Sequence, residues 1–222
     1  MTSYTWHFEV IWQYHKLFLA GTGVTIGLTI AVVVLGLVVG LVAGLMQLAH
    51  SPILRWVSWA YIEMFRLTPL LVLLLWFYYA LPMLTGIKLD ALSAAVITLS
   101  LYGGSFYAEV IRGGIVSIEP GQTEAGLALG MTPARVMRRI VLPQAIKRMI
   151  PPLMNQSIIQ FKNTSLVSVL AVPDLLYQGQ IVAMDTYRAL EVYSVIAAIY
   201  FIVLLPLTVI VKMAERRLAQ SN

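Results

Sequence analysis

The sequence predicts an all-α, polytopic membrane protein, for three reasons. Hydrophobic residues make up 59% of the chain and charged residues only 11%, whereas roughly 25% of residues are charged in soluble domains. The mean hydropathy is correspondingly high, at +0.84. Runs without any charge extend over 17–49 and 67–87, and about 20 apolar residues are enough for a helix to cross a bilayer. We expect five transmembrane helices, at about 17–48, 64–87, 90–112, 151–173 and 191–213.

The first 16 residues mix aromatic side chains with charged ones. This composition is typical of a segment that lies in the membrane interface, so we expect an interfacial N-terminal segment at 1–16. It is not a secretory signal, because a basic start is missing and the apolar run that follows is too long. The first transmembrane helix carries Gly36, Gly40 and Gly44, and this spacing predicts one face that packs closely against another helix.

The second and third helices are each bordered by an acidic and a basic residue three positions apart. Glu63 and Arg66 stand at the start of the second helix, and Glu109 and Arg112 close the third. Side chains at this spacing are neighbours on a helix surface, so each pair could form an ion pair. Pro69 fits the first turn of the second helix, where its missing N–H leaves no hydrogen bond unmade.

Residues 113–150 are the longest part of the chain that a bilayer would not accept. Gly113-Gly114 predicts the end of the third helix. Good helix formers over 123–129 predict a short helix that ends at Gly130.

A second helix of this stretch is expected to start at Thr132-Pro133, as its N-cap and first residue. It should end or bend before Pro143. Pro151-Pro152 then restarts the chain with the fourth transmembrane helix, and a polar loop separates that helix from the fifth.

The distribution of basic residues predicts the orientation of the chain. Eleven of the fifteen Lys and Arg residues fall on one side of the five predicted helices, three fall on the other, and Lys162 lies within a helix. Because basic residues accumulate in cytoplasmic loops, we expect 113–150 and the C-terminus inside and the N-terminus outside. The net charge of +5 fits this topology, so no nucleic-acid partner is expected.

The residue inventory does not predict an enzyme. Cysteine is absent, the three histidines lie outside or at the edges of the predicted helices, and no cluster of metal-ligand type occurs, so no metal site is expected. An ATP-binding P-loop requires Gly-Lys-Ser/Thr, and none of the five lysines follows a glycine. If ATP drives this protein, another chain binds ATP and Mg²⁺.

Lys162 is the one ionisable residue well inside a predicted helix. A charge within a membrane is costly and usually faces a cavity or a partner. Two interpretations stay open: Lys162 lines a translocation path and meets a substrate carboxylate, or it pairs with backbone carbonyls or a carboxylate such as Glu109 to fix helix packing. About 12 residues into its helix, it would lie roughly 18 Å deep, near the midplane where transporter sites tend to lie.

One spaced pattern in 113–150 resembles a known family. Glu124-Ala125-Gly126 is followed by Gly130 and then by Ile140-Val141-Leu142-Pro143. This spacing is similar to the EAA loop of the membrane-spanning subunits of bacterial ABC importers, with glycine as the third small residue. On its own, the short helix would also fit an ordinary amphipathic surface helix. The long spacing to Ile140-Val141-Leu142-Pro143 favours the EAA loop instead. The resemblance implies a coupling helix that docks in a groove of an ATPase, with these coupling residues: Glu124, Ala125, Gly126, Gly130, Leu142 and Pro143.

Three further blocks resemble the polar amino acid subgroup of these permeases. They are EMFRLTPLLV at 63–72, with Leu67 in place of the usual glycine, YAEVIRGG at 107–114, and N-Q, K-N-T-S-L and V-P-D-L within 155–175. The residues to which we assign a structural role are Glu63, Arg66, Pro69, Glu109 and Arg112. The residues expected to line the substrate path are Lys162, Asn163, Thr164 and Ser165.

The resemblance implies an ABC importer transmembrane domain of type I over 17–217, in a bacterial inner membrane. Its expected partners are two cytoplasmic ATPase subunits, a second permease subunit that is identical or a paralogue, a periplasmic or lipid-anchored amino acid binding protein, and membrane lipid. ATP hydrolysis by the partner would drive import of a polar amino acid, coupled through the loop 113–150.

Two other function classes are considered, an ion-gradient-driven secondary carrier and a non-transporting membrane scaffold subunit. A secondary carrier would be expected to contain inverted repeats and acidic residues within the membrane. The two halves of the chain do not match in hydropathy, five is an odd number of helices, and no Asp or Glu lies deep in a predicted helix. The sequence does not predict which amino acid is carried.

Overall fold

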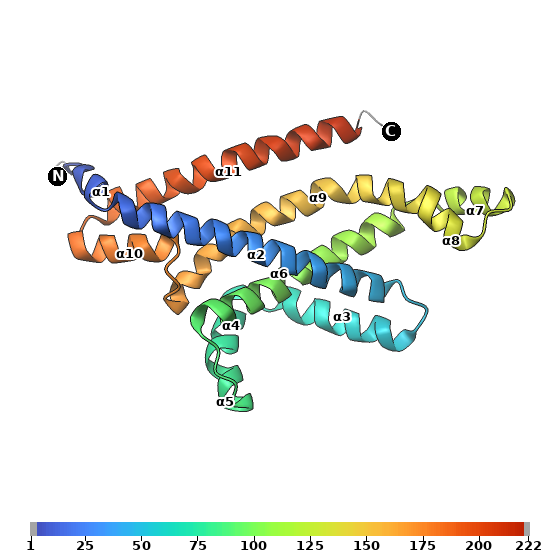
Figure 1. The fold of residues 1–222 in the computed structure, drawn as a ribbon, viewed down its shortest axis with the longest axis horizontal. Helices are drawn as coiled ribbons and strands as arrows, with labels where there is room; N and C mark the ends of the chain where they lie inside the picture. The colour runs from blue at the N-terminus through green and yellow to red at the C-terminus, as the bar shows by residue number, and fades with distance from the viewer. Residues whose placement is uncertain (1–3, 220–222) are drawn as a thin grey trace. The chain divides into compact units, whose positions relative to one another are not determined.

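The computed structural model describes residues 4–219, and within that range every regular element is helical (Figure 1). The prediction of an all-α protein is confirmed for this range. The α-helices are α1 (Glu9–Gln13), α2 (His15–Gln47), α3 (Pro52–Leu67), α4 (Leu70–Leu75), α5 (Leu81–Thr85), α6 (Ala91–Val116), α7 (Pro120–Ala128), α8 (Pro133–Val136), α9 (Leu142–Asn163), α10 (Leu175–Thr186) and α11 (Ala189–Ala219). Two π-helical turns, Trp76–Ala80 and Met137–Val141, and a 3-10 helix, Thr164–Leu170, connect some of them.

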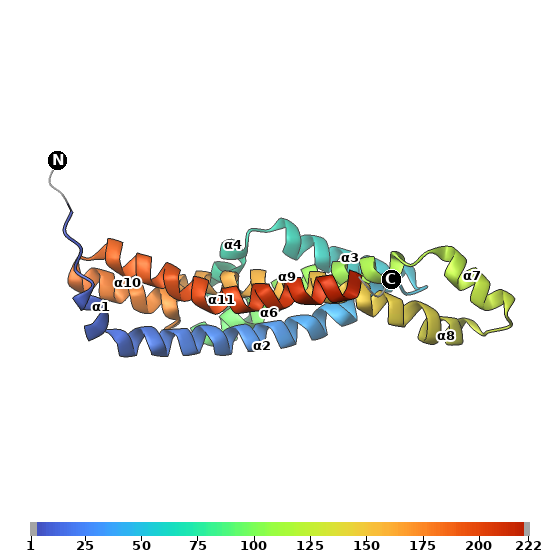
Figure 2. The ribbon, with the colours of Figure 1, turned by 90° about the horizontal axis from the view of Figure 1, so that it is seen from above.

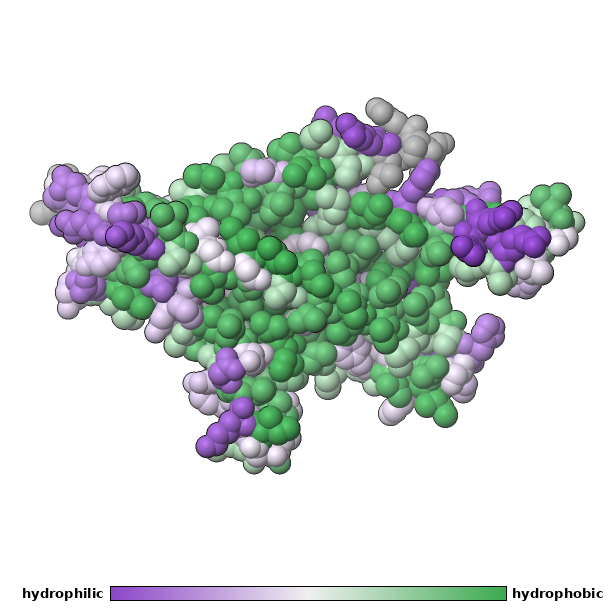
Figure 3. Space-filling model, in the orientation of Figure 1, coloured by the Kyte–Doolittle hydropathy of each residue, from purple (hydrophilic) through white to green (hydrophobic). Residues whose placement is uncertain are grey.

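Several of these helices fit a bilayer. Within the described range, three are long and apolar enough to cross one: His15–Gln47, Ala91–Val116 and Ala189–Arg217. Two bent pairs could each form one more span: Pro52–Leu67 with Leu70–Thr85, bent by 106°, and Pro133–Leu170 with Leu175–Thr186, bent by 48°. Hydrophobic side chains cover the visible surfaces of α2 and α11 (Figure 3). The structure therefore supports between three and five spans.

The chain forms two compact units. Of the described residues, the first contains 4–32, 70–99 and 158–207, and the second contains 33–69, 100–157 and 208–219. The core of the first unit is built from α2, α10 and α11 around Phe18, Leu175, Val182, Val192 and Ile196. A core of the second unit is built from α6, α8 and α9 around Ile111, Val136, Val141, Ala145 and Met149.

The glycine face predicted on α2 is confirmed in the second unit. Gly36, Gly40 and Gly44 all face α6. A Cβ atom at Gly40 would lie 2.5 Å from Cβ of Tyr107, and one at Gly44 would lie 2.9 Å from the carbonyl oxygen of Ala108. Because any larger residue would clash, the three glycines allow the two helix backbones to approach each other.

The start of the second predicted helix, 64–87, is wrong. A separate helix, α3, already covers Pro52–Leu67, and the chain bends by 106° before α4. Pro69 lies in this bend and not in a first helical turn. A residue before proline avoids the α conformation, and Thr68 is extended, with ψ 130°. The Thr68-Pro69 pair therefore breaks the helix.

The predicted end of the third helix at 112 is also wrong. α6 begins at Ala91, as expected, but it continues through Gly113 and Gly114 to Val116. A Cβ atom at Gly114 would lie 2.1 Å from Cγ of Met149 on α9. This glycine therefore permits helix packing and does not terminate the helix.

Prolines do not divide the chain between 133 and 163. Thr132 is the N-cap residue and Pro133 the first residue of α8, as predicted. The helix then continues through the π-helical turn into α9, so of the two outcomes expected at Pro143, a stop or a bend, the stop does not occur. The expected restart at Pro151-Pro152 is wrong, because both prolines lie inside α9. The π-helical turn lies directly before Leu142-Pro143, where proline cannot complete the usual i to i−4 hydrogen bond.

The fourth predicted helix, 151–173, corresponds to the end of α9 and the 3-10 helix. That 3-10 helix ends at Leu170, and its C-cap residue, Ala171, has φ 57°. The segment expected to be a polar loop is instead the helix α10, with Asp174 as its N-cap. The carboxylate of Asp174 accepts a hydrogen bond from the backbone N–H of Tyr177 at 2.9 Å, and aspartate is one of the preferred N-cap residues.

The first and last predicted transmembrane helices have counterparts close to the predicted ranges. Residues 1–3 of the predicted N-terminal segment lie outside the described residues, its described part contains the short helix α1, and α2 begins at His15, two residues before the predicted start. The last helix, α11, extends to Ala219, beyond the predicted end at 213.

Candidate functional site

The helices α7 and α8 form a hairpin in the second unit (Figures 1 and 2). α7 ends at Ala128 with Leu129 as its C-cap residue, and the next residue, Gly130, has φ +76°. The N–H groups of Gly130 and Met131 donate to the carbonyls of Leu127 and Gly126, at 2.9 and 3.1 Å. Glycine adopts this left-handed conformation without strain, so Gly130 sets the turn. The predicted short helix ending at Gly130 is confirmed, and it starts earlier, at Pro120.

Gly126 is the buried residue of α7. A Cβ atom there would lie 2.8 Å from Cγ2 of Val136 and 2.9 Å from Cδ1 of Ile140. Gly126 therefore allows α7 to pack closely against Val136 and Ile140 inside the hairpin. Because Gly126 is buried there, it does not fit a direct contact with a partner protein. The sequence pattern alone does not show which side of α7 faces α8.

The opposite side of the hairpin is open to solvent. Glu124 and Ala125 are exposed, and Leu127 and Leu129 are 44% and 82% exposed. Leu142 is exposed at the start of α9, next to Pro143. The hairpin thus presents one carboxylate together with apolar side chains, a combination suited to contact with another protein.

The hairpin is attached to α6 and α9 by packing and hydrogen bonds. Ile118 and Val136 are buried with Met149. The guanidinium of Arg148 donates to the carbonyl of Ser117 at 2.5 Å. A force applied to the hairpin would therefore reach these two long helices through direct contacts.

An ion-pair cluster joins α3 to α6 in the second unit. Glu109 accepts two hydrogen bonds from Arg112, at 3.3 and 3.1 Å, and lies 3.8 Å from Arg66. The guanidinium of Arg66 also lies over the ring of Phe106, 5.6 Å from its centroid. The predicted Glu109–Arg112 pair is confirmed, whereas Arg66 pairs with Glu109 and not with Glu63. Glu109 belongs to a helix far along the chain, so the local i, i+3 spacing could not indicate it.

The predicted substrate-path residues lie at the end of α9 and the start of the 3-10 helix, in the first unit. Lys162 is exposed in the last turn of α9. Asn163 is half-buried and donates to Oε1 of Gln160 at 3.4 Å. The hydroxyls of Thr164 and Ser165 donate to backbone carbonyls three residues earlier, at 2.7 and 2.8 Å. Of the four side chains, only Lys162 is exposed.

Buried polar side chains that the sequence reasoning missed lie in the same unit. Gln160 and Asp174 are fully buried, and Nε2 of Gln160, Oδ2 of Asp174 and the hydroxyl of Tyr200 have no hydrogen-bond partner. The hydroxyl of Thr25 accepts from the backbone N–H of Leu175 at 3.1 Å. Buried polar groups are usually paired, so unpaired ones indicate a place where water, a ligand or another subunit supplies the partner. The Val-Pro-Asp-Leu block around Asp174 was the signal available in the sequence.

The N-terminal segment is attached to the turn between α10 and α11. The hydroxyl of Tyr4 and the backbone N–H of His7 donate to the buried carboxylate of Glu191, at 2.5 and 3.0 Å. The hydroxyl of Tyr14 donates to Asp185. Because each of these two tyrosines donates to a carboxylate, the pKa of Tyr4 and that of Tyr14 are raised above the ordinary value of 10.

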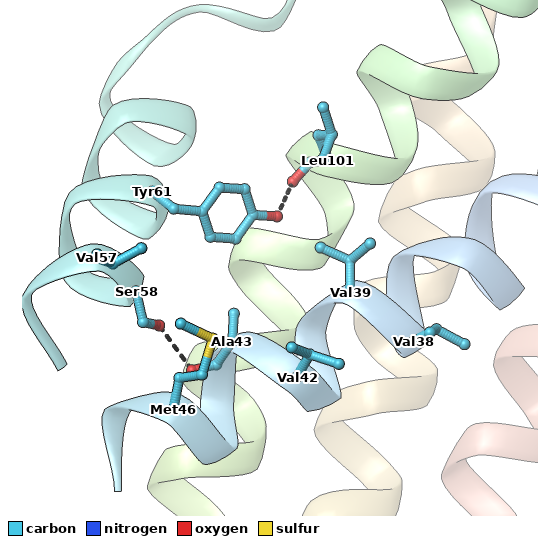
Figure 4. Close-up of a pocket in the computed structure, with 9 residues that line it drawn as sticks. All are labelled: Val38, Val39, Val42, Ala43, Met46, Val57, Ser58, Tyr61 and Leu101. Atoms are coloured by element: carbon cyan, nitrogen blue, oxygen red, sulfur yellow. Dashed lines mark hydrogen bonds between the residues drawn. The ribbon is translucent and has the colours of Figure 1, made fainter. Parts of the chain in front are cut away.

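An apolar groove of about 340 Å³ lies between α2, α3 and α6 in the second unit (Figure 4). Its two polar side chains are used internally: the hydroxyl of Ser58 donates to the carbonyl of Ala43 at 2.7 Å, and that of Tyr61 donates to the carbonyl of Leu101 at 2.6 Å. Neither hydroxyl proton is left for a ligand, so this groove does not fit a polar substrate. Among the described residues, no group of three metal-ligating side chains occurs.

Comparison with known families decides what kind of protein carries this hairpin. Residues 36–220 match the family described as "Binding-protein-dependent transport system inner membrane component". The chain belongs to this family of transport-system membrane components. The match includes the whole α7–α8 hairpin and every predicted substrate-path residue.

Relatives of this membrane component are named as permease proteins for amino acids. The glutamine transport system permease protein GlnP of Escherichia coli K12 is 42% identical over 163 residues, which cover 73% of this chain and 74% of the relative. The probable glutamine ABC transporter permease protein GlnM of Bacillus subtilis 168 is 41% identical over 168 residues, 76% of this chain and 77% of the relative. The arginine transport system permease protein ArtQ of the same Bacillus strain is 36% identical over 167 residues, 75% of this chain and 76% of the relative.

Solved structures agree with the fold of this membrane component. A crystal structure of an amino acid ABC transporter with histidines matches with a TM-score of 0.91 and 39% identity, over 96% of this chain and 100% of that one. An inward-facing MetNI methionine ABC transporter matches with a TM-score of 0.70 and 21% identity, over 90% and 96% of the two chains. The second likeness shows a shared fold.

Proposed function

We propose that this membrane component is the permease subunit of an ATP-driven importer for a polar amino acid. The observation that carries the proposal is the exposed α7–α8 hairpin, which holds the EAA-like pattern in a chain whose relatives transport glutamine and arginine. The substrate class rests on the names of those relatives, and the mechanism rests on the hairpin. ATP and Mg²⁺ would be bound by a partner ATPase.

The proposed orientation follows from charge. Eleven basic residues on the side of the hairpin and the C-terminus, against three on the other side, favour a cytoplasmic hairpin and an N-terminus outside. In this arrangement the protein spans a bacterial inner membrane five times, with the transmembrane domain over 17–217 and the segment 1–16 at the outer interface.

The proposed assembly contains two cytoplasmic ATPase subunits, a second permease subunit and an external amino acid binding protein. The hairpin is the part of this chain suited to receive force, because it is exposed on one side and packed on α6 and α9 on the other. Closure of the ATPases on ATP would move the hairpin, and the helices attached to it would change the side on which the path is open. Glu124, Ala125, Leu142 and Pro143 would contact the ATPase, while Gly126 and Gly130 shape the hairpin.

The proposed path includes Lys162, supported by its exposure at the end of α9. A lysine at this depth could meet a substrate carboxylate. Lys162→Ala should then abolish uptake at normal protein abundance, while Lys88→Ala, an exposed lysine outside the helices, should transport normally. Normal uptake by Lys162→Ala would remove Lys162 from the path.

The proposed coupling is tested by copurification of the ATPase with membrane-inserted variants. Glu124→Lys changes the exposed carboxylate, and Gly130→Asp strains a position with φ +76°. Both should be inserted but should lose ATPase binding or ATP-driven uptake. Glu119→Lys, which makes the same charge change on an exposed residue just before α7, is the matched control. Full ATPase yield together with full uptake in both variants would overturn the coupling role.

A further inference from the structure

The 3-10 helix Thr164–Leu170 continues α9 and ends four residues before α10 (Figure 1). Runs of 3-10 helix longer than three or four residues are uncommon, and they often mark a hinge or a strained sequence. The C-cap residue of this one, Ala171, has φ 57° and ψ 25°. Residues other than glycine adopt this left-handed conformation rarely and at a cost in free energy. We call residues 164–171 the 3-10 segment.

Hydroxyl side chains support the three-residue turns of the 3-10 segment. Thr164 donates to the carbonyl of Phe161, three residues earlier, at 2.7 Å. Ser165 and Ser168 also donate to carbonyls three residues earlier, at 2.8 and 2.9 Å. Threonines of the α-helices donate instead to the carbonyl four residues earlier, and these are Thr22, Thr29, Thr98 and Thr186. The side chains of the segment therefore follow the winding of its backbone.

The sequence of the 3-10 segment would also permit an α-helix. Residues 164–171 contain neither glycine nor proline. In the 3-10 form, Thr164, Val167 and Leu170 lie on one face, and all three are buried. In an α-helix, positions i, i+3 and i+7 share a face, so Ala171 would replace Leu170 beside the other two. Both forms thus keep a face suited to burial.

Buried polar groups on both sides of the 3-10 segment lack partners in this conformation. Gln160 lies before the segment and Asp174 after it, and both are fully buried. Each uses one oxygen as an acceptor, for Asn163 and Tyr177 respectively. Nε2 of Gln160 and Oδ2 of Asp174 have no hydrogen-bond partner among the residues that the structure describes. Unpaired buried groups are costly, so the 3-10 form is penalised at both ends as well as at Ala171.

We propose that the 3-10 segment is a hinge that rewinds into an α-helix during the transport cycle. The inference rests on the proposed function, because it assigns a movement to the proposed path. A 3-10 helix rises about 2.0 Å per residue and an α-helix about 1.5 Å. Rewinding four to seven residues would therefore shorten the connection by about 2–3.5 Å, and each residue would add a turn of about 20°.

The movement would be transmitted to Lys162, which directly precedes the 3-10 segment. The far end of the segment is fixed, because the hydroxyl of Thr25 on α2 accepts from the N–H of Leu175 at 3.1 Å. α2 also packs closely on this end: a Cβ atom at Gly21 would lie 2.9 Å from Cα of Leu175. With the start of α10 held in place, rewinding would turn Lys162 relative to α10.

Ala171→Gly tests the hinge by removing the backbone strain of the 3-10 form. The melting temperature should rise by about 2–4 °C. ATP-driven uptake should fall about fivefold, because the stabilised form converts less readily. Tyr187 is the matched control, with φ 56° and ψ 26° and a side chain that is 91% exposed. Tyr187→Gly should raise the melting temperature similarly and leave uptake unchanged, and normal uptake by Ala171→Gly would contradict the hinge.

Spin-label distances measure the movement directly, in a chain that has no cysteine of its own. Ile159→Cys on α9 and Met184→Cys on α10 place labels at exposed sites on either side of the 3-10 segment. In the complete transporter, a non-hydrolysable ATP analogue should change their distance by about 2–4 Å, the rewinding estimated above. Leu19→Cys on α2, paired with Met184→Cys, is the control, and that distance should stay constant.

The outcomes separate the hinge from the proposed function. An unchanged distance between the labels at 159 and 184, in a transporter that takes up an amino acid with ATP, overturns the hinge and leaves the proposed function intact. An equal change of both label pairs also overturns it, because the movement then lies outside the 3-10 segment. If the complete wild-type transporter shows no ATP-driven uptake, the proposed function fails and the hinge fails with it.

Discussion

Gly126 on α7 and Val136 on α8 lie in direct contact: a Cβ atom at Gly126 would be 2.8 Å from Cγ2 of Val136. This contact closes the hairpin and leaves Glu124 and Leu127 on the exposed side. The shape of the surface that we assign to the ATPase is therefore determined by packing within the permease. Gly126, the third small residue of the EAA-like pattern, therefore affects that surface through packing inside the hairpin and not through direct contact.

Replacement of Gly126 by a large residue should open the hairpin. We expect Gly126→Leu to lower the free energy of unfolding by about 1–3 kcal/mol, the usual cost of overpacking, and to weaken ATPase binding. Gly121→Ala is the control on the same helix, because nothing lies within 4 Å of its added Cβ atom. Thermal unfolding in detergent measures both variants. Equal melting of Gly126→Leu and wild type would contradict the packing described for Gly126.

Glu109 should be coupled more strongly to Arg112 than to Arg66. It receives two hydrogen bonds from Arg112, whereas Arg66 stays 3.8 Å away. All three side chains are partly exposed, so we expect a coupling energy of about 0.5–1 kcal/mol for Arg112 and less for Arg66. Double-mutant cycles measure these energies, and both should shrink at high salt. Glu63→Gln is the matched control, and a larger effect of Glu63→Gln than of Glu109→Gln would refute the assignment.

Asp174 should stabilise α10 through its N-cap hydrogen bond and not through its negative charge. Asp174→Ala removes the hydrogen bond to Tyr177 and should destabilise α10 by about 1 kcal/mol. Asp174→Asn keeps an oxygen acceptor and removes a buried charge, so its stability should equal or exceed that of wild type. Asp90, which accepts from the N–H of Ser93 at 3.1 Å on an exposed surface, is the comparison site. Equal destabilisation by Asp174→Asn and Asp174→Ala would contradict this prediction and would show that the negative charge of Asp174 has an interaction partner.

The attachment of the N-terminal segment should be lost at high pH. The pKa values of Tyr4 and Tyr14 are raised by their hydrogen bonds to Glu191 and Asp185. A raised pKa in the folded state means that this stabilisation is complete below about pH 10 and is lost as the pH rises through the raised values. Fluorescence of the tryptophans in residues 4–14 should therefore change only above pH 10. The double variant Tyr4→Phe, Tyr14→Phe should show the detached signal at pH 7, and a signal unchanged from wild type would contradict the attachment.

Local signals in the sequence predicted the parts of the structure that depend on neighbouring residues. The glycine face of α2, the start of α6 and the turn at Gly130 follow from spacing and backbone preference. The same reasoning predicted a possible stop at Pro143 and a restart at Pro151-Pro152, but a π-helical turn leads directly into α9, and α9 continues through both later prolines. It also missed the start of α3 at Pro52, twelve residues before the start of the predicted second helix at 64.

For the candidate site, sequence reasoning found the hairpin but not its orientation. The burial of Gly126 depends on Val136 and Ile140, which no single-residue rule connects to it. In the same way, the ion pair between Arg66 and Glu109 joins two helices that no local spacing connects. The burial of Asp174 is not evident from the sequence, because the polar residues that follow it predict a loop where the structure has α10.

ATP-dependent uptake by the reconstituted transporter tests the central claim most directly. Vesicles containing the permease, its ATPase and the external binding protein are loaded with ATP and given radiolabelled glutamine, arginine or another polar amino acid. The account predicts uptake of at least one of these that requires ATP and the ATPase and is lost with Glu124→Lys. Uptake driven by an ion gradient without the ATPase, or no uptake of any amino acid in the complete system, would contradict it.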